Sequence, residues 1–245
     1  MELIFKQQFQ ITTSAVDCFG RLKPSMLLYF CQEVAGNHCI RLGTDYESMA
    51  AKNMFWAVIR QKVQITRLPR VGETITLETW PMPTTRTKYP RATVAYDAEG
   101  KELFKVLGLW VVMDLNTRAM ILPKNSGVIV DGTIRGGELS VPGGITPRDL
   151  EGLYSRRVAF SDLDRNGHMN NTRYLEWMAD LLDSSFHREN TPKEISINYH
   201  AEAREGQMLH LNWKLDEENQ LLVDALRQEP GDEQMHRVFA AKVQF

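Results

Sequence analysis

A short run in the second half of the chain gathers side chains suited to acid–base chemistry. The run Ser161-Asp-Leu-Asp-Arg-Asn-Gly-His-Met-Asn-Asn171 contains two aspartates, three asparagines and a histidine. Asp, Asn and Gly favour turns and asparagine caps helices, which accounts for Asp162, Asn170 and Asn171. His168 has no special role in a turn. An imidazole, an amide and a carboxylate beside a helix N-terminus could instead move a proton and polarise a carbonyl group.

The same run does not indicate a metal site. Asp164 and His168 lie four residues apart, with no second histidine or cysteine nearby. Zinc sites of this kind use three or four clustered ligands. We therefore expect no bound metal, and no other cofactor.

A second stretch, Ile195-Ser-Ile-Asn-Tyr-His-Ala-Glu-Ala-Arg-Glu-Gly206, begins as an alternating strand and ends in charged residues. Taken by itself, Glu202 fits a solvated carboxylate at the end of a strand, paired with Arg204. His200 and His210 follow the strand period and fit ordinary strand residues.

The elements that must position these stretches occur twice along the chain. In each half a short strand precedes a polar loop, a helix and a series of alternating apolar strands. Helices are expected over about 24–41, where Pro24 suits the first turn, and over about 171–187. Later strands are expected over 55–68, 73–80, 87–96 and 103–114, and over 194–200, 207–215, 220–227 and 236–244. A helix followed by antiparallel strands predicts the α+β class, with each long helix wrapped by its own sheet.

The two halves also align with each other. Asp17 and Gly20 fall on Asp164 and Gly167 at one constant offset, and a second offset aligns the strands that follow the helices. A repeat this long indicates a duplicated domain rather than a solenoid, whose repeats run ~20–50 residues.

A stretch rich in glycine and proline separates the halves, and residues of both types break helices and strands. We therefore expect an N-terminal domain over 1–125, a linker over 126–149 and a C-terminal domain over 150–245.

Composition and charge exclude several classes of protein. The chain is 43% hydrophobic and 24% charged, which supports a packed core rather than disorder. A net charge of −2 gives no basic field for nucleic acid, and no apolar run approaches the ~18 residues that span a membrane. The start of the chain does not look like a secretory signal peptide, and the three cysteines fit reduced thiols. We expect a cytoplasmic protein.

These motifs together resemble those of the acyl-acyl-carrier-protein thioesterases, which are built as two tandem hotdog domains. The segment S-D-L-D-R-N-G-H-M-N-N-T-R-Y-L-E-W is similar to the family's S-D-L-D-x-N-x-H-x-N-N-x-x-Y-x-x-W, and I-N-Y-H-A-E-A resembles its L-E-Y-R-x-E-C. The first half is similar in its order of strand, helix, W-x-V, R-x-G-E and W-P. The resemblance implies a hydrolase of fatty acid biosynthesis that releases a fatty acid from acyl carrier protein.

The resemblance also assigns roles to residues. The family's catalytic Asp, Asn and His fall on Asp164, Asn166 and His168, and its catalytic Glu falls on Glu202. The family position often occupied by cysteine is Ala203 here, and the second half contains no cysteine. We therefore expect activated water as the nucleophile, with either the histidine or the glutamate as general base.

The first half has lost this chemistry at the matching loop. That loop reads Asp17-Cys-Phe-Gly-Arg21, so Phe19 replaces the asparagine and Arg21 replaces the histidine. The resemblance implies that this half supplies the acyl-chain pocket.

The implied partner is an acidic acyl carrier protein that delivers the acyl group on phosphopantetheine. Arg165, Arg173 and Asn170 lie close to the expected site and are candidates for substrate binding. No nucleic acid or membrane span is expected, and a homodimer is compatible with the sequence. Two alternatives stay open: an acyl-CoA thioesterase, and a non-catalytic hotdog module that binds an acyl thioester.

Overall fold

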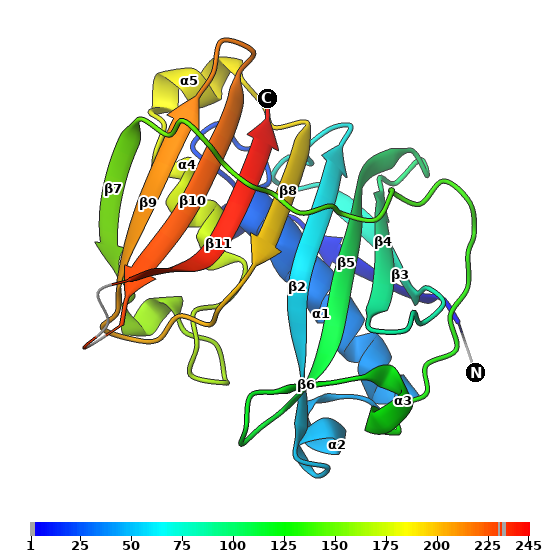
Figure 1. Ribbon diagram of the computed structural model, residues 1–245. Helices are drawn as coiled ribbons and strands as arrows, with labels where there is room; N and C mark the ends of the chain where they lie inside the picture. The colour runs from blue at the N-terminus through cyan, green and yellow to red at the C-terminus, as the bar shows by residue number, and fades with distance from the viewer. Residues whose placement is uncertain (1–2, 230, 232–233) are drawn as a thin grey trace. The chain divides into compact units, whose positions relative to one another are not determined.

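The computed structural model describes residues 3–229, 231 and 234–245 (Figure 1). The contacts among these residues define two units, one ending at Pro142 and the other beginning at Gly143. Each unit combines an antiparallel sheet with helices, as the α+β prediction requires.

The first unit is built on an antiparallel sheet with the strand order β1-β3-β4-β5-β2, and a short strand β6 pairs with β5. Its strands are β1 (Phe5–Gln10), β2 (Met54–Ile65), β3 (Thr74–Pro81), β4 (Tyr89–Tyr96), β5 (Glu102–Asp114) and β6 (Met120–Ile121). The expected strands therefore form within a few residues of their predicted ends. Alternation explains this agreement, since Ile75 and Leu77 of β3 are both fully buried on one face.

The long helix α1 (Pro24–Leu42) packs against β1 and β3 of this unit (Figure 1). Pro24 occupies the first turn, where its missing N–H costs nothing, and Gly43 ends the helix in the left-handed conformation with φ 65°. Leu27 and Val34 lie on its fully buried face. Three short helical segments complete the unit: η1 (Thr13–Ala15), α2 (Tyr46–Ala50) and α3 (Pro123–Ser126).

The stretch expected to be a linker is largely irregular, but its first part packs on the first unit. Val128 is buried in a cluster with Tyr89. Arg135 forms an ion pair of 2.5 Å with Glu78, and its guanidinium lies 4.8 Å above the Trp80 ring. These contacts explain why the first unit extends to Pro142.

The second unit repeats the topology of the first. Its sheet has the order β7-β9-β10-β11-β8, which corresponds strand for strand to β1-β3-β4-β5-β2. Its elements are β7 (Gly152–Arg157), η2 (Phe160–Asp162), α4 (Arg173–Ala179), α5 (Ser184–Glu189), β8 (Glu194–Tyr199), β9 (Met208–Leu215), β10 (Gln220–Gln228) and β11 (Met235–Gln244). The prediction of two tandem hotdog domains is therefore confirmed.

One detail of that prediction is wrong, because the second unit has no single long helix over 171–187. The segment is divided into α4, of seven residues, and α5, of six. Asp183 starts the second helix: its carboxylate accepts hydrogen bonds from the Phe186 N–H at 2.8 Å and the Ser185 hydroxyl at 2.6 Å. Such side-chain bonds to the local backbone compete with helix continuation.

Among the helices that the structure describes, none combines the length and the apolar character needed to span a membrane.

Candidate active site

The loop from Asp164 to His168 is held by its own backbone. The Asp164 N–H donates to the His168 carbonyl at 2.8 Å, and the Gly167 N–H donates back to the Asp164 carbonyl at 3.0 Å. Gly167 has φ 74°, a conformation that other residues adopt only with strain. The loop therefore presents the Asn166 and His168 side chains from a fixed frame.

The structure brings His168 together with Glu202. The His168 Nε2 atom lies 3.2 Å from Glu202 Oε2. The imidazole is 10% exposed and the carboxylate 37%, so the carboxylate is the more accessible of the two. Immediately beside this pair, the Met169 N–H donates to the Ala203 carbonyl at 2.8 Å, which ties the two stretches together.

Asp164 and Asn166 have different positions in the loop. Asp164 Oδ1 accepts hydrogen bonds from the backbone N–H groups of Asn166 at 2.8 Å and His168 at 3.4 Å. Asn166 is exposed at the tip, and among the described contacts its Nδ2 makes only one long bond, of 3.4 Å to Asp164 Oδ2. Asp164 therefore orders the loop, while the asparagine amide has donor capacity left for a substrate.

Tyr174 of α4 lies in the same neighbourhood. Its side chain is fully buried, and its ring centroid lies 4.6 Å from that of Phe239. Burial raises the pKa of the Tyr174 phenol; the positive charge of Arg227 opposes this shift and the negative charge of Glu202 adds to it. Tyr174 is therefore a neutral phenol next to the site.

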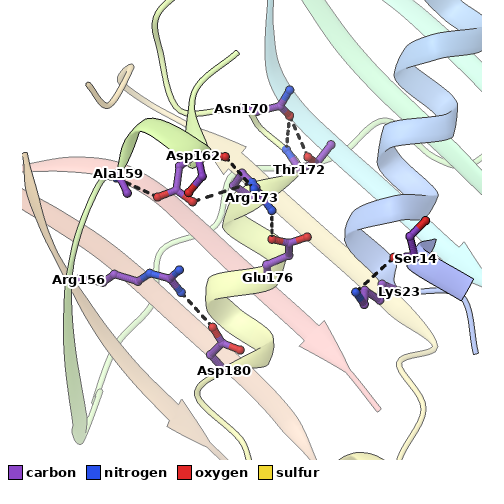
Figure 2. A network of polar contacts seen from close by, with 11 residues as sticks. Ser14, Lys23, Arg156, Ala159, Asp162, Asn170, Thr172, Arg173, Glu176 and Asp180 are labelled. Carbon is purple, nitrogen blue, oxygen red and sulfur yellow. Dashed lines mark hydrogen bonds and ion pairs between the residues drawn. The ribbon is translucent and has the colours of Figure 1, made fainter. Parts of the chain in front are cut away.

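Arg173, a candidate for substrate binding, is engaged with the loop instead of extending freely (Figure 2). Its guanidinium donates to the Ser161 carbonyl at 2.7 Å, pairs with Glu176 and lies 3.9 Å from the Asp162 carboxylate. Asp162 is only 3% exposed, and its carboxylate accepts the Ala159 N–H at 3.0 Å. This network anchors the segment that leads into the Asp164 loop.

Asn170, the second candidate for substrate binding, forms a local turn just before α4. Its Oδ1 accepts the backbone N–H and the hydroxyl of Thr172, both at 2.9 Å. The helix α4 begins at Arg173 with Thr172 as its N-cap, so neither Asn170 nor Asn171 is the helix cap that the sequence predicts. Arg165, the third candidate, is exposed on the loop.

In the part of the chain that the structure describes, no three His, Cys, Asp or Glu side chains gather closely enough to hold a metal ion. Ala203 is fully buried where a cysteine often stands in the family's motif. Of the three free cysteines, Cys31 is buried, and burial raises the pKa of its thiol.

Two sequence models of one family match the chain. The model described as the acyl-ACP thioesterase N-terminal domain matches residues 2–123, and the model of the C-terminal domain matches residues 151–239. A chloroplastic acyl-[acyl-carrier-protein] hydrolase of Cuphea viscosissima is 23% identical over 84% of this chain and 53% of its own length. A chloroplastic palmitoyl-acyl carrier protein thioesterase of Gossypium hirsutum is 24% identical over 84% of this chain and 54% of its own. The chain thus spans about half the length of these curated relatives.

Solved structures match over nearly the whole chain. An acyl-ACP thioesterase from Bacteroides thetaiotaomicron is 25% identical with a TM-score of 0.86, covering 99% of this chain and 97% of that one. A 12:0-ACP thioesterase from Umbellularia californica is 19% identical with a TM-score of 0.82, covering 100% and 97%. At 19% identity, the likeness to the Umbellularia californica structure shows a shared fold.

Proposed function

The chain belongs to the acyl-ACP thioesterase family, and from that premise we propose that it hydrolyses fatty acyl-acyl carrier protein to a free fatty acid and the carrier protein. The observation that carries this proposal is the 3.2 Å contact between His168 and Glu202. General acid–base groups must lie within hydrogen-bond reach of each other and of the reacting water, and this pair satisfies the first requirement.

Glu202 is the general base in this proposal. His168 donates its Nε2–H to one carboxylate oxygen and fixes the orientation of the group, while the more exposed carboxylate can take a proton from water. The water oxygen bonds to the thioester carbonyl carbon as its proton moves to Glu202. The carbon–sulfur bond then breaks, and the proton passes to the departing thiolate. The products are a fatty acid and the phosphopantetheine thiol.

Asn166 stabilises the charge that develops on the carbonyl oxygen. Its amide is exposed at the tip of the loop and makes one long hydrogen bond among the described residues, which leaves an N–H available. Asp164 holds the loop in place by accepting the backbone N–H groups on either side of Gly167. A fixed donor of this kind typically contributes ~10²–10³-fold to turnover.

The carrier is proposed to be acyl carrier protein, with the first unit supplying the acyl-chain pocket and Arg165 near the entry of the phosphopantetheine arm. We place the protein in the cytoplasm, whereas the plant relatives are described as chloroplastic. A homodimer is retained as a prediction, to be checked by measuring molar mass in solution.

Turnover of one acyl chain on two carriers tests the proposed function. Purified protein is given acyl-acyl carrier protein or the matching acyl-CoA, over a series of chain lengths, and free fatty acid is measured. We expect hydrolysis of the carrier-protein substrate and its loss in His168→Ala. Faster hydrolysis of every acyl-CoA would support the acyl-CoA thioesterase instead. Tight binding of acyl carrier protein without release of fatty acid would support a non-catalytic module.

A further inference from the structure

One arginine outside the family's motif is bonded to the segment that carries Glu202. Arg227 lies on β10, with a side chain that is only 13% exposed. Its Nη1 donates to the backbone carbonyl of Glu202 and, at 3.1 Å, to Gln207 Oε1. Its Nε donates to Glu229 at 2.6 Å, which balances the charge and fixes the plane of the guanidinium.

Gln207 ties the same segment, residues 202–207, at its other end. Besides the guanidinium, its Oε1 accepts the backbone N–H of Arg204 at 2.8 Å. The Met169 N–H, directly after the loop histidine, donates to the Ala203 carbonyl at 2.8 Å within this segment. Arg227 therefore bonds to the backbone that must be held in place if the carboxylate is to meet the imidazole.

The first unit makes the same turn without an arginine from the matching strand. There Glu73 stands in the position of Gln207 and accepts the Arg70 N–H at 2.7 Å. Its cationic partner is Arg67, which comes from the turn's own segment and donates at 2.8 Å. Leu68, buried, stands at the position of the catalytic glutamate. The turn of the first unit therefore forms without an arginine from a neighbouring strand. The second unit, which carries the carboxylate, has such an arginine.

The charge of Arg227 also reaches the site. Arg227, Glu202 and Asp164 all influence the pKa of the buried Tyr174 phenol, the arginine by lowering it and the two carboxylates by raising it. The guanidinium therefore lies close enough to oppose the concentration of negative charge around the phenol.

We propose that Arg227 is a positioning residue for Glu202. By bonding to the glutamate's backbone carbonyl and to Gln207, it holds the carboxylate at the distance at which His168 Nε2 can donate to it. The expected effect of Arg227 on turnover rests on the proposed thioesterase function. Its expected effect on the contact between His168 and Glu202 rests on the geometry alone.

Two readouts test the proposal on the full chain. The first is turnover of acyl-acyl carrier protein by Arg227→Met, by Glu202→Gln and by the double variant. We expect Arg227→Met to lower kcat by ~10–10²-fold with little change in KM, because small misplacements of a catalytic group cost this much. In the Glu202→Gln background the same change should cost less than about twofold, since the group that it positions is already lost. Arg227→Lys should restore part of the activity.

The control is Arg237→Met on β11. Arg237 also forms a two-bond ion pair within this sheet, to the buried Asp224 at 2.6 and 2.8 Å, but it has no bond to the Glu202 segment among the described contacts. We expect Arg237→Met to lose as much thermal stability as Arg227→Met does, while its kcat stays unchanged. Full additivity of Arg227→Met and Glu202→Gln, or an equal loss of kcat in the control, would overturn the positioning role.

The second readout does not depend on activity. The ring resonances of His168 are followed by NMR in the same variants. Arg227→Met should move them in the same direction as Glu202→Gln does, and Arg237→Met should leave them in place. Unmoved resonances in Arg227→Met would overturn the proposal even for an active enzyme. Moved resonances in a protein without thioesterase activity would uphold it and refute the proposed function alone.

Discussion

The loops Asp17–Arg21 and Asp164–His168 have the same backbone conformation, but their side chains make different contacts. In the first, the Asp17 N–H donates to the Arg21 carbonyl at 2.8 Å, and the Gly20 N–H donates to the Asp17 carbonyl at 3.0 Å. The second loop has the same two bonds at the same lengths. The glycines have φ 73° and 74°. The loop conformation is therefore a property of the fold, independent of the chemistry.

The side chains account for the difference. Asp17 is neutralised by its own loop, since Arg21 Nε donates to its Oδ2 at 3.0 Å and Nη2 lies at 2.9 Å. In the second loop a histidine replaces the arginine, and its imidazole meets Glu202 instead. At the position that matches this glutamate the first unit has the buried Leu68. A few substitutions on one frame thus separate a loop with an internal Asp–Arg ion pair from a loop whose imidazole contacts a carboxylate.

Exchanging the loop sequences is the change with the largest expected effect. The double variant Asn166→Phe, His168→Arg gives the second loop the side chains of the first. The introduced arginine should pair with Asp164 as Arg21 pairs with Asp17, so the protein should fold. Turnover should fall by at least ~10²-fold, the usual contribution of a general acid–base group. Activity and thermal unfolding are measured together; a folded variant with normal turnover would contradict the assignment of chemistry to this loop.

A smaller effect is expected at Glu73, which matches Gln207. Hydrogen bonds from Arg67 hold the pKa of Glu73 below its ordinary value. Because the pKa is lowered in the folded state, the stabilisation is present above the unfolded pKa of ~4.3 and is lost as the pH falls through the folded value. Glu73→Gln should therefore lower the free energy of unfolding by ~0.5–1 kcal/mol at neutral pH, and by less in acid.

Urea unfolding at pH 7 and pH 3 measures this difference. Gln207→Ala is the comparison in the second unit. Because Gln207 is uncharged, any loss in the free energy of unfolding that this variant causes should not have this pH dependence. If Glu73→Gln lowers the free energy of unfolding by the same amount at pH 3 as at pH 7, the charge of Glu73 does not contribute to stability.

The smallest effect is expected from the cysteines, all of which lie in the first unit. Water, not a thiol, is the proposed nucleophile, and burial raises the pKa of the Cys31 thiol, which keeps it protonated. The triple variant Cys18→Ala, Cys31→Ala, Cys39→Ala should keep turnover within about tenfold of the original. A greater loss in a protein that still unfolds cooperatively would count against attack by water.

The strands and the loop Asp164–His168 could be predicted from sequence because both depend on local patterns. Strand alternation places Ile75 and Leu77 on one buried face, and the repeated D-x-x-G frame gives the same loop twice. The division of the expected second helix was not foreseen. Asp183 starts the second of the two helices through its bonds to Ser185 and Phe186, and helical periodicity does not report such bonds.

The side-chain bonds of individual polar residues are harder to predict from sequence than the strands are. Asp162 is a turn residue as the sequence predicts, since its carboxylate accepts the N–H of Ala159, but the sequence does not indicate that it is buried. Arg173 stays a candidate for substrate binding, and its bonds to Ser161 and Glu176 could not be read from the sequence. Arg227 gave no signal at all, because its bond to a backbone carbonyl depends on how β10 passes the Glu202 segment.

The most direct test of the account is a single-turnover comparison of Glu202→Gln with Glu205→Gln. The two residues lie three positions apart, but Glu202 contacts the His168 imidazole while Glu205 is an exposed turn residue. With acyl-acyl carrier protein as substrate, hydrolysis should slow by at least ~10²-fold in Glu202→Gln and stay within about twofold in Glu205→Gln. Equal rates in the two variants, or a loss confined to Glu205→Gln, would contradict the central claim that the His168–Glu202 pair performs the chemistry.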